Sequence, residues 1–199
     1  MSHVLHLSKD KKLRSIMLLQ DECVLEKKKH IHLHICSSII SQQLSTKVAA
    51  VIYARFLALF NKKHPTPQDV VAIPFEHLRS IGLSNAKANY VLNVCHFFIS
   101  NKVTDASLHK MEDEALIQFL TQIKGVGRWT VEMILMFALG REDVFAVDDL
   151  GIQQSICKLY AIDPANKKAM KEQMLKVSAK WSPYRTYACR YLWGWKDGD

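Results

Sequence analysis

The residues best suited to chemistry gather in one stretch of the sequence, from Ile123 to Asp149. Gly125 and Gly127 interrupt a region that otherwise favours helix, and the stretch ends on a second consecutive acid after Asp148. Glycine permits positive φ and close approach of a backbone, and a helix that restarts after it presents N–H groups and the positive end of its dipole. A phosphate oxygen suits such a site, although the same pattern also serves as a plain helix connection.

The composition limits the kind of protein that carries this stretch. A chain of 199 residues can bury a core, as one domain or as two small lobes. Its 49% hydrophobic and 23% charged residues are typical of a soluble globular protein. Its 27 Lys plus Arg against 19 Asp plus Glu give a net charge of +8. This charge favours a polyanionic partner, and a basic protein without a nucleic-acid role remains the alternative.

Neither a membrane nor a metal cluster is expected from the sequence. No apolar run reaches the roughly 18 residues that span a bilayer, and the N-terminal segment lacks the apolar core of a signal peptide. We therefore expect an intracellular protein. The five cysteines are scattered without a close pair that could begin a zinc or iron–sulfur site, so we expect reduced packing residues. They are Cys23, Cys36, Cys95, Cys157 and Cys189.

The elements that must position these residues are helices. Apolar residues recur at spacings of three and four over residues 37–63, 85–102, 111–123 and 127–140. The segment around Ile31 alternates instead, but it leads directly into a helical pattern and is more typical of an entry segment than of a strand. We therefore predict an all-α fold.

Turn residues divide the chain into about ten helices. Pro65 and Pro67 prevent a continuing helix, and Thr66 can cap a new one that begins at Pro67. Similar stops lie at 82–84, 102–107, 125–127 and 163–164. We expect two helical lobes, one formed by residues 1–66 and 161–199 and the other by residues 67–160.

Several motifs together resemble a known family. The run "LTQIKGVGRWT" followed by "DVFAVDDLGIQ" resembles the helix-hairpin-helix and catalytic acid of the HhH-GPD superfamily of DNA glycosylases. The runs "SIISQQLSTKVA", "PTPQDV", "LRSIGLSNAKANYVLNV" and "WSPYRTYACRYLW" resemble its alkylation-repair subgroup, the bacterial 3-methyladenine DNA glycosylase II type. The resemblance covers most of the chain after residue 30. It implies a hairpin at about 116–139, an active site in the cleft between the lobes, and a minimal member without the N-terminal β-domain of some relatives.

The resemblance implies a hydrolytic enzyme. Base excision flips the nucleotide out of the stack and cleaves a C1′–N bond through an oxocarbenium-like transition state. The resemblance makes Asp149 the carboxylate that stabilises this charge and orients the attacking water, while Asp148 points elsewhere and caps the helix that begins near Leu150. The alternative is that both acids form an N-cap pair without a catalytic role.

Trp129 occupies the position at which relatives that also cut the backbone carry a lysine. The lysine amine attacks C1′ and forms a Schiff base, and an indole cannot do so. We therefore predict a monofunctional glycosylase that leaves an abasic site. Its expected substrates are alkylated purines in duplex DNA, 3-methyladenine and also 7-methylguanine. These bases are cationic, so an aromatic face can bind them by stacking and cation–π contacts.

The resemblance places the base pocket and the DNA contacts on particular residues. The pocket residues are Trp193 as the stacking face, Trp129 and Tyr184 as walls, and Met133 and Glu132 nearby. For the tryptophans, ordinary core packing is the alternative, and the role of Glu132 is open. The expected DNA contacts are Lys124, Gly125, Val126, Gly127, Arg128 and Thr130 in the hairpin, Ser84 and Lys87 at another helix start, and Gln42 and Gln43.

Gln42 and Gln43 are expected to fill the gap that the flipped nucleotide leaves, with Gln43 at the position where a relative inserts an apolar wedge. Two glutamines on an exposed helix face are the alternative. His30, His32 and His34 would share one face of an extended segment, but nothing at a completing distance favours a metal site. The resemblance implies no cofactor and no iron–sulfur cluster, and it allows a structural Na⁺ or K⁺ at the carbonyls of Thr121, Ile123 and Val126.

Two other functions compete with this prediction. One is a helix-hairpin-helix protein that binds DNA lesions without excising them, and the other is an oxidised-base glycosylase with lyase activity. The expected partner is double-stranded DNA with alkylated bases, bound by a monomer. The expected location is the bacterial cytoplasm, at the nucleoid, or the nucleus if the source is eukaryotic.

Overall fold

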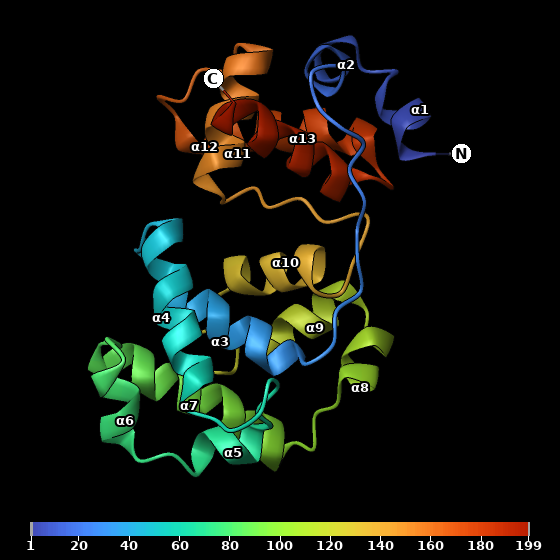
Figure 1. The fold of residues 1–199 in the computed structure, drawn as a ribbon. Coiled ribbons are helices and arrows are strands. Elements are labelled where there is room, and N and C mark those ends of the chain that lie inside the picture. The colour runs from blue at the N-terminus through green and yellow to red at the C-terminus, as the bar shows by residue number, and fades with distance from the viewer. Residues whose placement is uncertain (1, 199) are drawn as a thin grey trace. The chain divides into compact units, whose positions relative to one another are not determined.

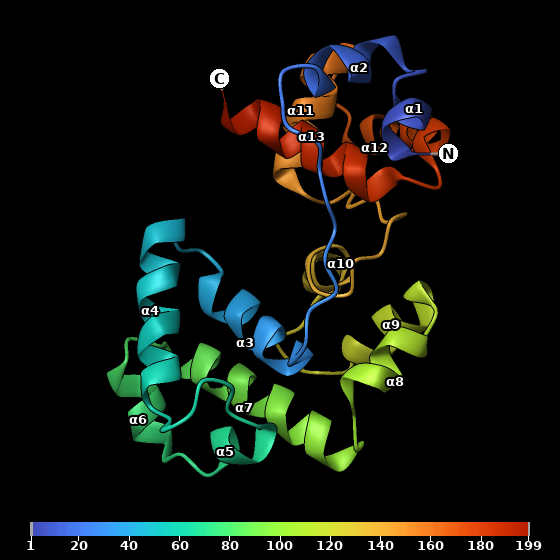
Figure 2. The same cartoon turned by 45° about the vertical axis from the view of Figure 1, so that its right-hand side comes forward.

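The protein is all-helical, as the apolar periodicity predicts. The computed structural model describes residues 2–198, and within that range it contains helices and no strand. The chain divides into two compact units, one formed by Met1–Glu26 with Leu135–Asp199 and the other by Lys27–Ile134. Figures 1 and 2 show the helices of both units. No helix in the described range is long and apolar enough to cross a membrane. The predicted placement of the active site in a cleft stays a prediction.

The unit of Lys27–Ile134 is organised around α3 and α7. Helix α3 packs against α4 and α7, and both α5 and α6 pack against α7. Fully buried apolar side chains such as Ile35, Ile39, Val91 and Val94 fill the space between these helices. The helices are α3 (Ile31–Ser41), α4 (Thr46–Ala58), α5 (Pro67–Val71), α6 (Phe75–Ser80), α7 (Asn85–Ser100), α8 (Asp105–Lys110), α9 (Asp113–Leu120) and the first part of α10 (Arg128–Phe137).

The helix boundaries in this unit follow the predicted turn chemistry. Thr66 caps α5, which begins at Pro67, and Asp69 returns a bond to the Thr66 backbone to complete a capping box. The predicted stops at 82–84 and 125–127 lie between two helices, whereas the one at 102–107 extends into α8, which begins at Asp105. The alternating segment around Ile31 is the first turn of α3, in which the buried His32 bonds to the Pro65 carbonyl through Nε2 at 2.9 Å.

The second unit packs both chain ends together. Helix α13 contacts α2 and α11, and α12 contacts α11 and η1. Asp10 connects three of these segments: it caps α2 and accepts bonds from the Tyr160 hydroxyl at 2.7 Å and from the Trp181 indole N–H at 3.2 Å. The elements are α1 (His3–Leu7), α2 (Lys11–Met17), α11 (Leu150–Tyr160), α12 (Lys167–Ser178), η1 (Ala179–Trp181) and α13 (Arg185–Asp197).

Asp10 gives this unit a pH-dependent contribution to stability. Burial pushes the Asp10 pKa up, but the bonds from Tyr160, Leu13, Trp181 and Lys12 outweigh it, so the pKa lies below its usual value. The contribution of such a carboxylate is complete above the unfolded pKa and is lost as the pH falls through the folded one. We expect Asp10→Asn to lower the unfolding free energy by about 1–2 kcal/mol at pH 7. The unfolding free energies of Asp10→Asn and wild type, measured by urea titration, should converge as the pH falls below about 4. A constant difference between them at all pH values would contradict this account.

The unit boundaries differ from the predicted lobes. Residues 27–66 belong with the central helices because α3 and α4 pack there, and residues 135–160 belong with the chain ends because α11 packs on α13 and α2. The sequence prediction placed a domain boundary at the prolines near residue 66. A proline break ends a helix, but it does not decide which neighbours that helix packs against.

Candidate active site

Asp149 stands at the start of α11 with its carboxylate held by two donors. Its Oδ1 accepts the Ile152 backbone N–H at 2.9 Å and the Trp193 indole N–H at 2.8 Å. The first bond makes Asp149 the N-cap of α11, where the helix dipole favours a negative charge. The carboxylate is half-buried, and its orientation is fixed by donors from two separate helices.

A glycine permits this contact between Asp149 and Trp193. A Cβ atom added at Gly151 would lie 3.0 Å from Cδ1 and 3.1 Å from Nε1 of Trp193, and 3.1 Å from Oδ1 of Asp149. Distances of this size are tighter than nine in ten real Cβ contacts, so a side chain here would force its neighbours to shift. The missing side chain therefore lets the indole reach the carboxylate across the first turn of α11.

The two neighbouring acids have different environments, and the N-cap of α11 is Asp149 rather than Asp148. Asp148 is exposed and forms an ion pair with Lys171 of α12, while Asp149 provides the cap. The prediction that Asp148 caps this helix is therefore wrong. The two acids therefore differ in their contacts, and the catalytic role of Asp149 stays a prediction.

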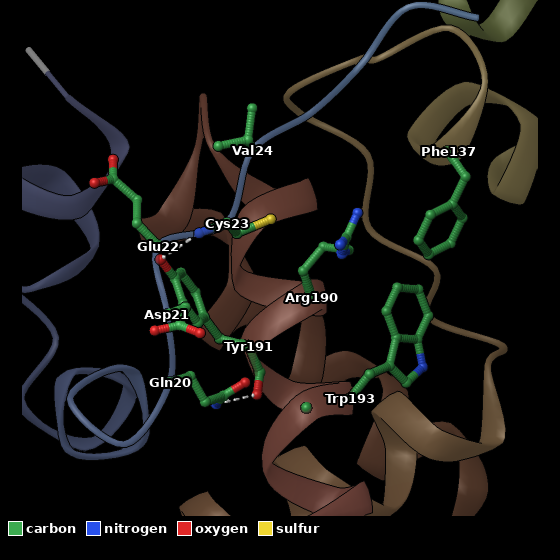
Figure 3. A pocket seen from close by; sticks show the side chains of 10 residues that line it. Gln20, Asp21, Glu22, Cys23, Val24, Phe137, Arg190, Tyr191 and Trp193 are labelled. Carbon is green, nitrogen blue, oxygen red and sulfur yellow. Dashed lines mark hydrogen bonds between the residues drawn. The ribbon is translucent and has the colours of Figure 1, made fainter.

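The Trp193 ring lies beside Phe137. The ring centroids are 5.6 Å apart with planes inclined by 33°, and the Arg190 guanidinium stands over the Phe137 ring at 5.2 Å. Both aromatic rings line a pocket of about 580 Å³, which Figure 3 shows together with Arg190 and the segment around Gln20. The structure therefore places an aromatic surface directly beside the indole that holds Asp149.

Tyr184 does not lie with these residues. It precedes the first turn of α13, and its ring contacts those of His3, His6 and Tyr187. Trp193 comes nine residues later, about 13 Å along the helix. The prediction that Tyr184 and Trp193 share one pocket is not supported by this geometry.

The turn between α9 and α10 depends on Gly125. This residue has φ +104°, and a Cβ there would lie 2.2 Å from Cγ of Tyr90 on α7. Asn93, also on α7, donates through Nδ2 to the Lys124 carbonyl at 3.2 Å. Two α7 side chains thus fix the turn in place, and the Lys124 side chain is exposed.

Gly127 serves a different purpose from Gly125. Its φ is not positive, and a Cβ added there would meet nothing within 4 Å. The first intrahelical bond of α10 runs from Val131 N–H to the Gly127 carbonyl at 3.2 Å, so the amides just before it stand at the open end of the helix. Gly127 leaves that end accessible to an anion.

Arg128 is directed at carboxylates of its own unit. Its Nη1 and Nη2 bond to the two oxygens of Glu114 at 3.2 and 2.9 Å, and its Nε bonds to Glu132 at 3.1 Å. The bond to Glu114 is the main cause of a raised Arg128 pKa. Glu132 is only 4% exposed. The guanidinium therefore joins α9 to α10, which differs from its predicted contact with phosphate, and it provides a partner for the acid whose role was open.

The other predicted residues of α10 have different exposures. Trp129 is 40% exposed, Met133 is half-buried, and the Thr130 side chain is buried, as is that of Val126 before the helix. A buried Thr130 hydroxyl is not available to a DNA surface. The Val126 amide is also engaged, because it donates to the Ile123 carbonyl at 2.9 Å.

Ser84 and Lys87 both make bonds within the unit. Ser84 caps α7 by accepting the Lys87 backbone N–H at 3.2 Å. The Lys87 ammonium donates to the carbonyls of Ile40 and Gln42 at 2.9 and 2.5 Å. The predicted phosphate contact of the Lys87 side chain is therefore replaced by a contact with the loop of Gln42 and Gln43, in which Gln43 is exposed.

The histidines near the start of α3 form no metal site. In the part of the chain that the structure describes, no group of three or more His, Cys, Asp or Glu side chains could hold a metal ion. The His30 ring stacks on that of His64 at 4.4 Å, while His32 is buried elsewhere. The cysteines form no disulfide in the described range.

Sequence reasoning missed three residues at this site. Gly151 had a signal, since a glycine inside the first turn of a helix costs stability and indicates close approach of another group. Phe137 and Arg190 had none, because an aromatic and a basic residue at ordinary helical spacing do not reveal which ring they will contact. Their position depends on how α13 packs, which the local sequence does not encode.

Comparison with known proteins agrees with this architecture. A model of the HhH-GPD superfamily base excision DNA repair proteins matches residues 36–180. DNA-3-methyladenine glycosylase 1 of Schizosaccharomyces pombe is 38% identical over 168 residues, which are 83% of this chain and 72% of that protein.

Solved structures agree as well. That of S. pombe 3-methyladenine DNA glycosylase Mag1 with abasic DNA matches with a TM-score of 0.83 and 32% identity, over 97% of this chain and 95% of that chain. DNA-3-methyladenine glycosidase from Bacillus halodurans matches with a TM-score of 0.82 and 34% identity, over 96% and 87%. The family model covers more than half of the sequence, so the chain belongs to the HhH-GPD superfamily of base excision DNA repair proteins.

Proposed function

We propose that this protein is a monofunctional DNA glycosylase that excises alkylated purines, chiefly 3-methyladenine, from duplex DNA and leaves an abasic site. The names of its relatives and its family membership support the enzyme class. The observation that carries the proposal is the Asp149 carboxylate, which two donors hold at the N–H edge of the Trp193 indole. A fixed anion next to an aromatic surface matches a reaction that moves positive charge from a base to a sugar.

Asp149 acts on the sugar in this mechanism. As the C1′–N bond breaks, positive charge develops at C1′, and a preorganised carboxylate stabilises it without having to reorient. The same carboxylate orients the water that attacks C1′. The Trp193 and Ile152 N–H groups act on Asp149 rather than on substrate, because they hold Oδ1 in one position.

The aromatic side chains act on the base. A purine methylated at N3 or N7 carries positive charge, and the face of an indole attracts a cation. Trp193 provides that face, with Phe137 beside it. Much of the selectivity then comes from the weakened glycosidic bond of the cationic base rather than from hydrogen bonds in the pocket.

The hairpin binds the DNA backbone. Backbone N–H groups at the open start of α10 donate hydrogen bonds to a phosphate oxygen, Gly127 allows the close approach, and the exposed Lys124 adds positive charge. The loop of Gln42 and Gln43 enters the duplex and fills the gap left by the flipped nucleotide. A single chain provides one hairpin and one pocket, which fits a monomer on duplex DNA.

A monovalent cation fits the hairpin turn without taking part in the reaction. The Ile123 carbonyl accepts one bond, from Val126 N–H, and a carbonyl oxygen has a second lone pair that a cation can use. The carbonyls of Thr121 and Val126 would complete the set. Such an ion would stabilise the turn that presents the amides of α10.

Trp129 provides no amine for strand cutting. A Schiff base requires an amine nucleophile at C1′, and none is offered at this position of α10. Incubation with methylated DNA and borohydride is expected to trap no covalent complex. A trapped complex would support the competing oxidised-base glycosylase with lyase activity, and strand cleavage without added base or heat would do the same.

The direct test is the release of bases from methylated duplex DNA. Purified protein is expected to liberate free 3-methyladenine, detected by chromatography, and to leave abasic sites that alkali then cleaves. Unmethylated DNA of the same sequence is the control. Binding to methylated DNA without release would instead favour a lesion-binding protein.

A further inference from the structure

The side chain of Lys87 connects two helices at one end of the Lys27–Ile134 unit. It starts in the first turn of α7, and its ammonium donates to the Ile40 carbonyl at 2.9 Å and to the Gln42 carbonyl at 2.5 Å. These carbonyls belong to the end of α3, where helix geometry leaves carbonyl groups without partners inside the helix. A cation at a helix C-terminus is also favoured by the helix dipole. The Lys87 ammonium thus donates hydrogen bonds to two carbonyls at the C-terminal end of α3.

The loop that follows α3 adopts a conformation that needs support. Gln43 has φ +60°, in the left-handed region that side-chain-bearing residues rarely occupy. Such residues persist where the surrounding structure holds them. The backbone of the loop makes a turn bond from Leu44 N–H to the Ser41 carbonyl at 3.0 Å and a longer bond from Gln42 N–H to the Ile39 carbonyl at 3.4 Å. Lys87 adds two bonds, one in the last turn of α3 and one to the residue directly before Gln43.

The environment of Lys87 argues against a direct role in binding phosphate. Two of the three N–H groups of its ammonium are directed at protein carbonyls, and burial lowers its pKa. Lys47 and Lys124, by contrast, are exposed. The Gln43 side chain is exposed and belongs to the loop that joins α3 to α4. Figure 2 shows the backbone of this loop.

We propose that Lys87 is a positioning residue: it holds the loop of Ser41 to Ser45 in the conformation that presents Gln43, and so it sets the efficiency of base flipping rather than the affinity for DNA. This inference rests on the proposed function for its consequence in catalysis. The two bonds from the Lys87 ammonium to the carbonyls of Ile40 and Gln42, called the latch below, are a property of the protein without DNA. The latch and its consequence in catalysis can therefore be tested separately.

The first test needs no substrate. In Lys87→Met, which keeps a side chain of similar length without the donor, amide hydrogen exchange at Leu44 should accelerate about tenfold or more, because local opening of the loop becomes easier. Exchange at Val94 in the middle of α7 should not change. Lys110→Met, which removes a charge from an exposed lysine at the end of α8, is the matched control and should leave Leu44 as in wild type. Unchanged exchange at Leu44 in Lys87→Met would overturn the latch, whatever the enzyme does.

The second test asks whether Lys87 acts through Gln43. Single-turnover excision should fall about tenfold in both Lys87→Met and Gln43→Ala, and the double variant should be no slower than the slower single one, because residues that act as a unit are not additive. Fluorescence of 2-aminopurine beside the lesion should report less flipping in all three. Lys87→Arg, which restores donors to the two carbonyls, should recover most of the rate. Fully additive losses would overturn the proposal.

The third test separates positioning from phosphate binding. Affinity for undamaged duplex and its salt dependence should be the same in Lys87→Met, Lys110→Met and wild type. Loss of a phosphate contact would instead reduce the slope of log K against log salt by about one, as is expected for Lys124→Met. A reduced slope in Lys87→Met would overturn the proposal. If wild type released no base at all, the proposed function would fail, and the exchange experiment would still decide the latch.

Discussion

Asp149→Asn is expected to reduce base release by at least about 10²–10³-fold while leaving the protein folded and able to bind DNA. The substitution removes the negative charge that stabilises positive charge at C1′, and it keeps the shape of the side chain. Asparagine is as good an N-cap as aspartate, and its Oδ1 can still accept the N–H groups of Ile152 and Trp193. The unfolding free energy should therefore change by less than about 1 kcal/mol.

Asp148→Asn is the matched control for this substitution. It removes the same charge one residue earlier, from an exposed side chain that pairs with Lys171. Such surface pairs contribute little, so activity should stay within about twofold of wild type. Wild type, Asp149→Asn and Asp148→Asn are compared by the rate of single-turnover base release from methylated duplex DNA. Urea titration checks that all three are folded. Normal excision by Asp149→Asn would show that the mechanism is wrong, and equal losses in both variants would point to a general effect of charge.

Local features of the fold could be predicted from the sequence. The helix that begins at Pro67 follows from Thr66 and the proline, because capping and the loss of a backbone donor act within a few residues. The turn at Gly125 was predictable for the same reason, since positive φ selects glycine. The HhH-GPD motifs added the family and the position of the hairpin, but the helix cap was assigned to Asp148 instead of Asp149.

Contacts between distant segments could not be predicted from the same signals. A lysine at a helix start suits phosphate or a carbonyl equally well, and only the packing of α3 on α7 directs Lys87 to Ile40 and Gln42. Arg128 is similar, because Glu114 lies on a separate helix. The division into units depends on which helices pack together, and helix breaks carry no information about that. Tyr184 was grouped with Trp193 by motif, although Tyr184 precedes α13 and Trp193 lies nine residues further along the same helix.

Gly125→Ala is expected to destabilise the protein by about 3–5 kcal/mol, since two penalties combine. An alanine at φ +104° is strained, and its Cβ would meet three Tyr90 atoms at 2.2–2.7 Å. For a chain of this length the loss corresponds to roughly a 10 °C fall in Tm, measured by circular dichroism. In a Tyr90→Ala background the contacts with Cγ and Cδ1 disappear, whereas the contact with the residue 90 Cβ at 2.7 Å and the backbone strain remain, so the same glycine substitution should cost less than it does in wild type.

Gly127→Ala separates the folding role of the hairpin from its binding role. A Cβ at this position meets nothing within 4 Å and φ is not positive, so the protein should lose at most about 1 kcal/mol of stability. The added methyl group stands where a phosphate must approach the start of α10, so affinity for undamaged duplex should fall. Equal destabilisation by both glycine substitutions would contradict the steric account of Gly125. Unchanged duplex affinity in Gly127→Ala would mean that the hairpin amides do not bind the backbone, and that the basic charge of the chain acts elsewhere.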